Sequence, residues 1–458
     1  MLSNCGQLRA RLKPRNLNNK NTHMKKSILN SLEATGVGMI TCALLAASPL
    51  AHAVEITNVK DGDVFRYPLV VIEGTCRGKL QFKSAAEASL DTTVADKFRG
   101  VVELKAGRNE LAFKDDAGVK TLALTYKPAT AEDYRVKVWY VVPKDEDPLK
   151  VKADQVDALY QTKLDLLTKV MQTWVAEDMK CGGYGAKTFY PEMRKDDPSK
   201  VDVGLLYTNQ TRAQWSAQGN SYDVARSVLP PQYATPKWRN LAFITCANVA
   251  QSSDNFCVIG YGTLVGKSPV RVSEIVKWMQ TPEPDAHLGA LSYRAFTGVT
   301  LHEFGHMIHW AWHPGGYNLI QDAYENVAEA FTVAMDPGVP HNEAARSSYG
   351  IQQELFNNSR FYWTSGDKQT YKDGTFTFAA KDGKFTVKAD HPLGAVFYYL
   401  PDANTQVAKL DGKQGKTWEM GIADIVKALG SAGNFSYMAV DVEGNEAHSF
   451  YVPPAAAK

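Results

Sequence analysis

Two histidines four residues apart, with a glutamate directly after the first, are the feature that most constrains this chain. The segment Leu301–Trp312 reads LHEFGHMIHWAW and carries them as His302, Glu303 and His306. In an α-helix, residues at i and i+4 share one face, so both imidazoles can converge on one cation. Glu303 lies about 100° further round the helix, where its carboxylate could face a water molecule held by that cation. The segment is therefore predicted to be a metal-binding helix.

This spacing is the HExxH motif, in which two histidines bind zinc and the glutamate acts as a general base. Histidine is rare in the chain, with ten among 458 residues, and a chance HExxH has odds of roughly one in a hundred. We therefore predict that His302 and His306 bind one Zn²⁺ ion per chain and that Glu303 is the catalytic base.

A catalytic zinc usually has three protein ligands and a water, so a third ligand is needed. The candidates are His309, His313 and Glu325. On an unbroken helix the two histidines would lie about 10 Å and about 16 Å beyond His302, because each residue rises about 1.5 Å. His313 is therefore too far to close on the same ion. A metzincin-type site would need a glycine at His309 and a histidine at Trp312, so that pattern is absent.

Glu325 could reach the ion from a second helix. Gly315 and Gly316 allow the chain to leave the first helix, and the pattern of Leu319–Met335 is helical again. Glu325 and Glu329 share the polar face of this predicted helix, and an antiparallel packing would bring that face to the imidazoles. The alternative is that this acidic face is exposed to solvent and binds no metal.

Eighteen residues separate His306 from Glu325, and with this gap the sequence resembles the gluzincin metallopeptidases, in which a glutamate follows HExxH at such a distance. HEFGHMIHW followed by ENVAE is also similar to the HEFxHMIHW…EGxSE pattern of secreted bacterial members. The resemblance implies that Glu325 is the third zinc ligand and that Glu329 orients a ligand histidine through a hydrogen bond. The chain departs from these relatives at Asn326, where they often carry glycine.

The reaction implied is hydrolysis of a peptide bond by a zinc-activated water, with Glu303 moving the proton from the water to the leaving amine. The oxyanion that develops needs a further donor, usually a tyrosine or a histidine. Tyr317, Tyr324, Tyr349 and His391 are all candidates, and the sequence does not choose among them.

Two rival functions remain open. One is a peptidase specific for glycoproteins or for peptides linked to the cell wall, as in enhancin-like families that share HExxH…E. The other is a non-catalytic surface-binding protein whose zinc is structural. The intact Glu303 argues against the second, because a structural site has no use for a general base.

The N-terminus has the composition of a secretory signal. Met24-Lys25-Lys26 begins a charged segment, Gly36–Leu50 is apolar, and Ala51-His52-Ala53 places small residues before a cleavage point. We expect residues 1–53 to be an upstream extension and signal peptide cleaved after Ala53, and the mature protein to be secreted or periplasmic. An uncleaved anchor is the alternative, but the apolar run is short for a membrane span, and no later segment approaches that length.

The charge balance bears on the expected partners. Without residues 1–53 the chain has 44 Lys and Arg against 48 Asp and Glu. This balance makes no electrostatic case for nucleic acid or for an anionic membrane surface. The expected partner is a protein or peptide substrate.

Four cysteines follow the predicted signal: Cys76, Cys181, Cys246 and Cys257. An even number in an exported chain fits two disulfides. We expect a bond between Cys246 and Cys257, which flank the polar segment AQSSDN, interpreted as a turn. A Cys76–Cys181 bond would complete the set, and buried free thiols are the alternative.

The fold class predicted is an α+β zincin-like catalytic domain preceded by a small all-β sandwich. Residues 54–128 show period-two alternation between turns, and KDGDVFRYPLVVIEG resembles bacterial immunoglobulin-like modules. Residues 134–458 are assigned to the metallopeptidase domain, which opens with the apolar strand Tyr134–Val142. Asp154–Lys180 is predicted to be a long helix, and KLDLLTKVMQTWVAEDM within it is similar to a helix of an uncharacterised metallopeptidase family with an N-terminal β-domain. A hairpin is expected to turn at Lys381-Asp382-Gly383.

Overall fold

The structure is a computed structural model, and the residues that it describes begin at Val54. They are 54–128, 134–146, 159–217, 221–253, 255–260, 268–281, 292–308, 327–333, 357, 359–363, 371–400, 408–411, 415–430 and 433–451. The predicted signal peptide lies outside these ranges. So do Glu325, Tyr317, Tyr324, Tyr349 and the two further histidines considered as ligands, His309 and His313.

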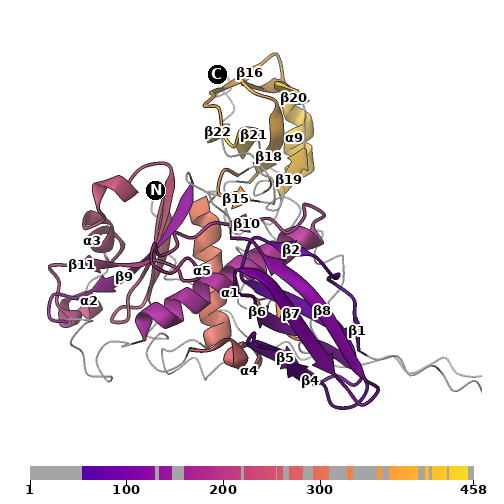
Figure 1. The fold of residues 1–458 in the computed structure, drawn as a ribbon. Helices are drawn as coiled ribbons and strands as arrows, with labels where there is room; N and C mark the ends of the chain where they lie inside the picture. The colour runs from indigo at the N-terminus through magenta and orange to yellow at the C-terminus, as the bar shows by residue number, and fades with distance from the viewer. Residues whose placement is uncertain are drawn as a thin grey trace, which may run out of the picture. The chain divides into compact units, whose positions relative to one another are not determined.

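Residues 54–128 form two four-stranded sheets, which confirms their predicted all-β character (Figure 1). One sheet has the order β1-β3-β6-β5, with β1 at Glu55–Ile56, β3 at Leu69–Thr75, β6 at Lys97–Glu103 and β5 at Ala88–Asp91. The other has the order β2-β8-β7-β4, with β2 at Val64–Phe65, β8 at Val119–Tyr126, β7 at Gly107–Lys114 and β4 at Gln81–Lys83. Val70 and Ile72 of the first sheet share a core with Leu111 and Leu124 of the second. This unit is called the sandwich below; its immunoglobulin-like topology stays a prediction.

The next unit is a five-stranded mixed sheet. Its order is β11-β9-β12-β14-β13, with β11 at Val203–Tyr207, β9 at Arg135–Val142, β12 at Trp238–Phe243, β14 at Phe256–Gly260 and β13 at Val249–Ser253. The first four strands are parallel, and β13 runs antiparallel to β14 at one edge. The sheet is therefore almost wholly parallel, which requires cover on both faces.

Helices supply that cover. Along β9, Val136, Val138 and Tyr140 point into a core shared with helices α1 (Tyr160–Cys181) and α5 (Tyr293–Ile308) (Figure 1). Residues of the intervening positions pack on the opposite face against α2 (Arg212–Ala217) and α3 (Ser221–Ser227). The predicted strand at Tyr134–Val142 is thus confirmed, and so is the described part of the long helix predicted at Asp154–Lys180.

Short elements complete this region. They are β10 (Thr188–Phe189), which pairs with β15 (Tyr362–Trp363), and α4 (Ile275–Gln280) with the 3₁₀ helices η2 (Pro231–Tyr233), η3 (Val272–Glu274) and η5 (Val327–Ala330). Of the helix predicted at Leu319–Met335, only residues 327–333 are described, and they form the single 3₁₀ turn η5 and the residues after it. No helix among the described residues has the length and hydropathy needed to cross a membrane.

The predicted disulfide between Cys246 and Cys257 is wrong, because no disulfide joins any of the four cysteines of the described chain. Cys257 lies on β14 and points into the core that contains α1 and α5, whereas Cys246 packs in the core on the opposite face of the sheet. The segment AQSSDN is not a turn over its whole length, because Ala250–Ser253 belong to the edge strand β13. Cys76 is buried in the sandwich and Cys181 is exposed at the end of α1, so the second expected bond is also not formed.

The C-terminal residues build two further sheets with a core of their own. One is β16-β17-β20, with β16 at Phe376–Lys381, β17 at Lys384–Ala389 and β20 at Thr417–Gly421; the other is β19-β18-β21-β22, with β19 at Ala408–Asp411, β18 at Leu393–Tyr399, β21 at Phe435–Asp441 and β22 at Glu446–Tyr451. Helix α9 (Ile422–Leu429) follows β20 directly. The predicted hairpin is confirmed: Asp382 and Gly383 turn between β16 and β17 with φ of 52° and 73°, as a two-residue hairpin loop requires.

Candidate active site

Helix α5 carries the three residues of the motif. Ser292 caps it, since the N–H of Ala295 donates to Ser292 Oγ at 3.1 Å. Phe304 and its neighbours on one side of the helix are buried in the core, with the ring centroids of Phe304 and Phe189 4.5 Å apart. Packing on this side fixes the rotation of α5, and the rotation decides where the motif side chains point.

The two imidazoles converge as the i, i+4 spacing predicts. The Nε2 atoms of His302 and His306 lie 3.2 Å apart, and the ring planes are inclined at 80°. Two nitrogens bound to one tetrahedral zinc at about 2.0–2.1 Å would lie ~3.3 Å apart. The pair therefore fits a zinc ion without rearrangement of the helix.

Glu303 is buried, with 5% of its surface exposed, beside this pair. Its Oε2 accepts a hydrogen bond from Ser252 Oγ at 2.6 Å. Burial raises the pKa of Glu303 to about 7, because it disfavours the charged form, and the Ser252 hydrogen bond opposes this rise. A carboxyl group with this pKa can accept and release a proton near neutral pH.

Ser252 is the residue of this site that sequence analysis missed. It lies on β13, the antiparallel edge strand, which packs against α5. A serine in a polar stretch has no chemical signature of its own, and the stretch was interpreted as a turn. Only the pairing of β13 with β14 and the packing of α5 bring the hydroxyl to Glu303.

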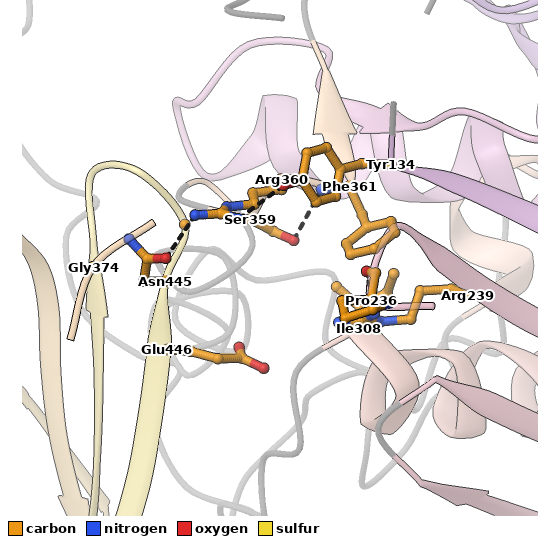
Figure 2. Close-up of a pocket in the computed structure, with 11 residues that line it drawn as sticks. Tyr134, Pro236, Arg239, Ile308, Ser359, Arg360, Phe361, Gly374, Asn445 and Glu446 are labelled. Carbon is orange, nitrogen blue, oxygen red and sulfur yellow. Dashed lines mark hydrogen bonds between the residues drawn. The ribbon is translucent and has the colours of Figure 1, made fainter. Parts of the chain in front are cut away.

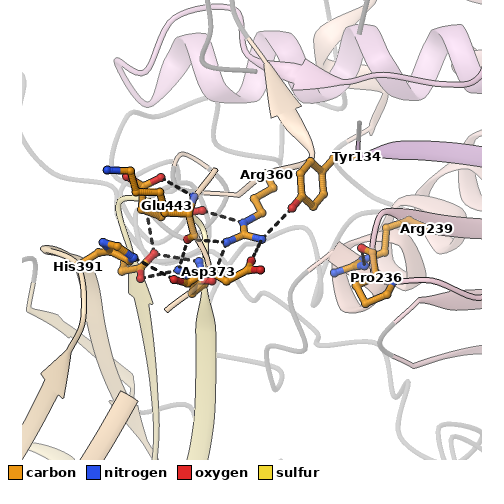
Figure 3. Close-up of polar contacts among 10 residues, drawn as sticks. Tyr134, Pro236, Arg239, Arg360, Asp373, His391 and Glu443 are labelled. Atoms are coloured by element: carbon orange, nitrogen blue, oxygen red, sulfur yellow. Dashed lines mark hydrogen bonds and ion pairs between the residues drawn. The ribbon is translucent and has the colours of Figure 1, made fainter. Parts of the chain in front are cut away.

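Of the remaining predicted residues, Glu329 and His391 are described, and the others lie outside the described residues. Within the described ranges, no third His, Cys, Asp or Glu side chain joins the two imidazoles as a metal-binding cluster. Glu329 is on η5, where its main-chain oxygen accepts a hydrogen bond from Arg99 Nη1 at 2.7 Å. His391 lies in the connection between β17 and β18, with its Nε2 3.2 Å from the oxygen of Asp373 (Figure 3).

A cavity of about 210 Å³ opens beyond the end of α5 (Figure 2). It is lined by Tyr134, Arg239, Ile308 and Arg360, and by residues of the C-terminal sheets such as Glu446. Ile308 follows His306 by two residues, which is about 200° round a helix, so it points away from the imidazoles. The cavity is therefore not the space in front of the motif.

Arg360 makes this cavity wall a structural junction (Figure 3). It donates to Tyr134 Oη at 2.8 Å, to the oxygen of Glu443 at 2.8 Å and to Asn445 Oδ1 at 2.6 Å. It also forms an ion pair with Asp373 at 3.0 Å. Arg360 thus ties the residue before β9 to the loop between β21 and β22.

One family model matches part of the chain. Residues 53–225 match the model of a "Putative peptidase family" (Metallopep). The matched part holds the sandwich, β9, α1 and β11 and ends before α5. It supports peptide-bond hydrolysis as the class of reaction. No curated protein matches the chain.

Among solved structures, wild-type OgpA from Akkermansia muciniphila is similar at 14% identity over 71% of this chain and 93% of that chain, with a TM-score of 0.43. Catalytically inactive OgpA in complex with an O-glycopeptide substrate is similar at 13% identity over 71% of this chain and 94% of that one, with a TM-score of 0.42. A "putative alpha-galactosidase" from Bacteroides fragilis covers 81% of this chain and 96% of its own length at 11% identity, with a TM-score of 0.15. Likenesses this distant carry no argument about activity or substrate.

Proposed function

We propose that this protein is a zinc-dependent peptidase whose metal is held by His302, His306 and Glu325. The observation that carries the proposal is the geometry on α5. The Nε2 atoms of His302 and His306 have the separation that one zinc ion requires, and the buried Glu303 beside them accepts a hydrogen bond from Ser252 of β13. The match of residues 53–225 to a peptidase family supports the same reaction class. The assignment of Glu325 rests on the sequence, because that residue lies outside the described ranges.

Each residue has a defined task in this proposal. A bound zinc ion would lower the pKa of a coordinated water and polarise the scissile carbonyl. Glu303 takes the proton of the attacking water at a carboxylate oxygen and delivers it to the leaving amine. The hydroxyl of Ser252 donates to Oε2 of this carboxylate, so that Glu303 keeps one orientation while it takes the proton and while it delivers it.

The position of β13 favours an extended peptide as the substrate. β13 is an edge strand, and within the described sheet its outer side has no strand partner. A peptide chain could add to this edge through main-chain hydrogen bonds. It would then run past Ser252, which lies on this strand and donates to Glu303 of α5. This strand edge therefore supports an extended peptide, bound beside the catalytic carboxylate, as the proposed substrate.

A structural zinc site is the non-catalytic alternative, and the environment of Glu303 disfavours it. Burying a carboxyl group destabilises the folded protein, as the raised pKa of Glu303 records. A site that only held metal would gain nothing from this. The second enzymatic candidate, a peptidase for glycoproteins or wall peptides, uses the same residues and differs only in its substrate.

The test uses purified protein with zinc on casein and on mucin, beside Glu303→Gln and Glu325→Ala. We expect wild type to cleave, Glu303→Gln to keep zinc and lose cleavage, and Glu325→Ala to lose zinc. Cleavage of mucin but not of casein selects the glycoprotein candidate. Equal cleavage by wild type and Glu303→Gln would refute the peptidase proposal, and full zinc occupancy in Glu325→Ala would exclude that ligand.

We also propose that the protein is exported to the periplasm or the medium, with a mature chain that begins at Val54. The support is the signal-like sequence of residues 24–53 alone, because the described cysteines form no disulfide that would support export. Mass spectrometry of the protein recovered outside the cytoplasm tests this. A chain that remains cytoplasmic and keeps residues 1–53 would refute it.

A further inference from the structure

The end of the edge strand β13 is bonded to side chains on both faces of the sheet. Successive side chains of a strand point to opposite faces, so Ser252 and Ser253 lie on different sides. Ser252 faces α5, where its Oγ donates to Glu303 Oε2 at 2.6 Å. Ser253 faces α3, where its hydroxyl and that of Tyr222 are hydrogen-bonded to each other. Two consecutive residues of β13 therefore link Glu303 to a tyrosine on the other face of the sheet.

Apolar packing fixes only the first part of β13. All five residues of this strand are half-buried, whereas the five residues of its neighbour β14 are buried. Val249 packs against the core on the α3 face, and Ala250 packs against the core on the α5 face. The next three residues, Gln251–Ser253, are polar and add no apolar side chain to either core. In the described structure, this end of the strand is held by its pairing with β14 and by the bonds of the two serine hydroxyls.

Tyr222 is itself held in place on α3. It is 5% exposed, and its ring meets that of Phe256 edge-on, with the centroids 5.5 Å apart. Phe256 is also the residue of β14 that pairs with Ser253. Arg226, one helical turn further along α3, donates from Nη1 to Tyr222 Oη at 3.3 Å and to Ser253 Oγ at 3.5 Å. The ring and the hydroxyl of Tyr222 are thus both engaged, which fixes the partner of Ser253.

A displacement of the strand end would reach Glu303 through Ser252. Consecutive Cα atoms are about 3.8 Å apart along a rigid peptide, so a shift at Ser253 also moves Ser252. The bond from Ser252 Oγ to Glu303 Oε2 tolerates little movement, because hydrogen bonds between oxygen atoms extend to only about 3.0 Å. A shift of about 1 Å in a catalytic group can cost about 100-fold in rate. The contact on the α3 face is therefore expected to matter for the chemistry on the α5 face.

We propose that Tyr222 is a positioning residue for Glu303, which it reaches across the sheet through Ser253 and Ser252. By holding the end of β13, Tyr222 keeps Ser252 Oγ on the carboxylate, so that Glu303 keeps the orientation that proton transfer requires. This role rests on the proposed function, in which Glu303 is the general base. It extends that function to α3, which lies on the face of the sheet opposite the imidazoles.

The test measures kcat and KM for peptide cleavage by the zinc-loaded protein in Tyr222→Phe, Ser253→Ala and the double variant. Both single substitutions remove the same hydrogen bond, and Phe keeps the ring that packs on Phe256. Ser253→Thr is the conservative variant, because it keeps a hydroxyl on a residue that suits a strand. Tyr233→Phe is the matched control: Tyr233 packs against the same core as Tyr222, but its hydroxyl donates to Glu192 Oε2 at 3.4 Å.

We expect Tyr222→Phe and Ser253→Ala each to lower kcat by about ten-fold or more, with KM and zinc occupancy as in wild type. The double variant should lose no more than the weaker single variant, since both substitutions remove one bond. Ser253→Thr should keep most of the activity. Tyr233→Phe should keep the wild-type kcat even where the Tm of its metal-free form falls as far as that of Tyr222→Phe.

Four outcomes would overturn the positioning role. They are wild-type kcat in both single variants, an equal loss in the control, a double variant whose loss is the product of the two single losses, and a rise in KM with kcat unchanged. The last would assign the contact to substrate binding. If one single variant does not fold, the other decides.

Glu303→Gln separates this role from the proposed function. Loss of cleavage in Glu303→Gln with wild-type kcat in Tyr222→Phe and Ser253→Ala refutes the positioning role alone. Wild-type kcat in Glu303→Gln refutes the proposed function. A loss in Tyr222→Phe would then act on a group other than Glu303, so the positioning role would fail with it.

Discussion

Replacing Glu303 by glutamine should remove a pH dependence from the stability of the metal-free protein. The pKa of Glu303 is about 7 in the folded protein, because burial disfavours its charged form, against an ordinary value of 4.5. Between these two values the folded protein keeps a proton that the unfolded chain has released. The free energy of unfolding therefore falls as the pH rises from about 4.5 to about 7, and this loss is complete above pH 7.

The size of the effect follows from the two pKa values. Their difference corresponds to about 3 kcal/mol, since one pH unit is worth about 1.4 kcal/mol, and about 2.5 kcal/mol of it falls between pH 5 and pH 8. Urea unfolding in the presence of EDTA at both pH values gives the free energies. Glu303→Gln should lose about 2.5 kcal/mol less than wild type over this range. The same loss in both proteins would refute the reasoning, because it would assign the whole pH dependence to other groups.

Three further predictions follow from the described contacts. Ser252→Ala should raise the pKa of Glu303 further, because it removes the hydrogen bond that opposes the rise. It should also lower kcat/KM by about ten-fold, since a hydrogen bond to a charged group is worth about 1.5–3 kcal/mol. A peptide-cleavage assay over a range of pH checks both, and an unchanged pH profile would contradict them. Exposed Cys181 should react with iodoacetamide in the folded protein, whereas Cys246, whose pKa burial raises to about 12, should react only after unfolding; mass spectrometry of the two peptides decides. Gly100→Ala should destabilise the sandwich by about 1–3 kcal/mol, because its Cβ would lie 2.0 Å from a main-chain oxygen of β5; an unchanged Tm would show that β5 gives way freely.

Features that depend on local spacing were predictable from the sequence. The convergence of His302 and His306 needs only a helix and a separation of four residues, and the helix is present with the two rings in place. The long helix α1 and the strand β9 follow in the same way from apolar periodicity. The hairpin at Asp382-Gly383 follows from turn residues that accept positive φ.

Features that depend on which face of a strand meets which neighbour were not predictable. Cys246 and Cys257 are close in sequence, which favoured a disulfide, but β14 turns one of them to the opposite face of the sheet. A register shift of one residue exchanges the two faces of a strand, and sequence proximity carries no information about it. The contact of Ser252 with Glu303 also depends on which face of a strand a side chain occupies. Ser252 lies on the edge strand β13, whose polar composition led to its interpretation as a turn.

The sequence by itself determined the chemistry that the site can perform, because residue types and helical spacing are local properties of the chain. It named the two imidazoles and the carboxylate of α5, and nothing in the described structure moves them apart. Only the tertiary structure decided the long-range contacts: Ser252 donates to Glu303, and Asp91 and Arg99 bind the main chain of residues 329–333. These contacts join residues far apart in the chain, from 51 to 242 positions, and they form only when separate sheets and helices pack.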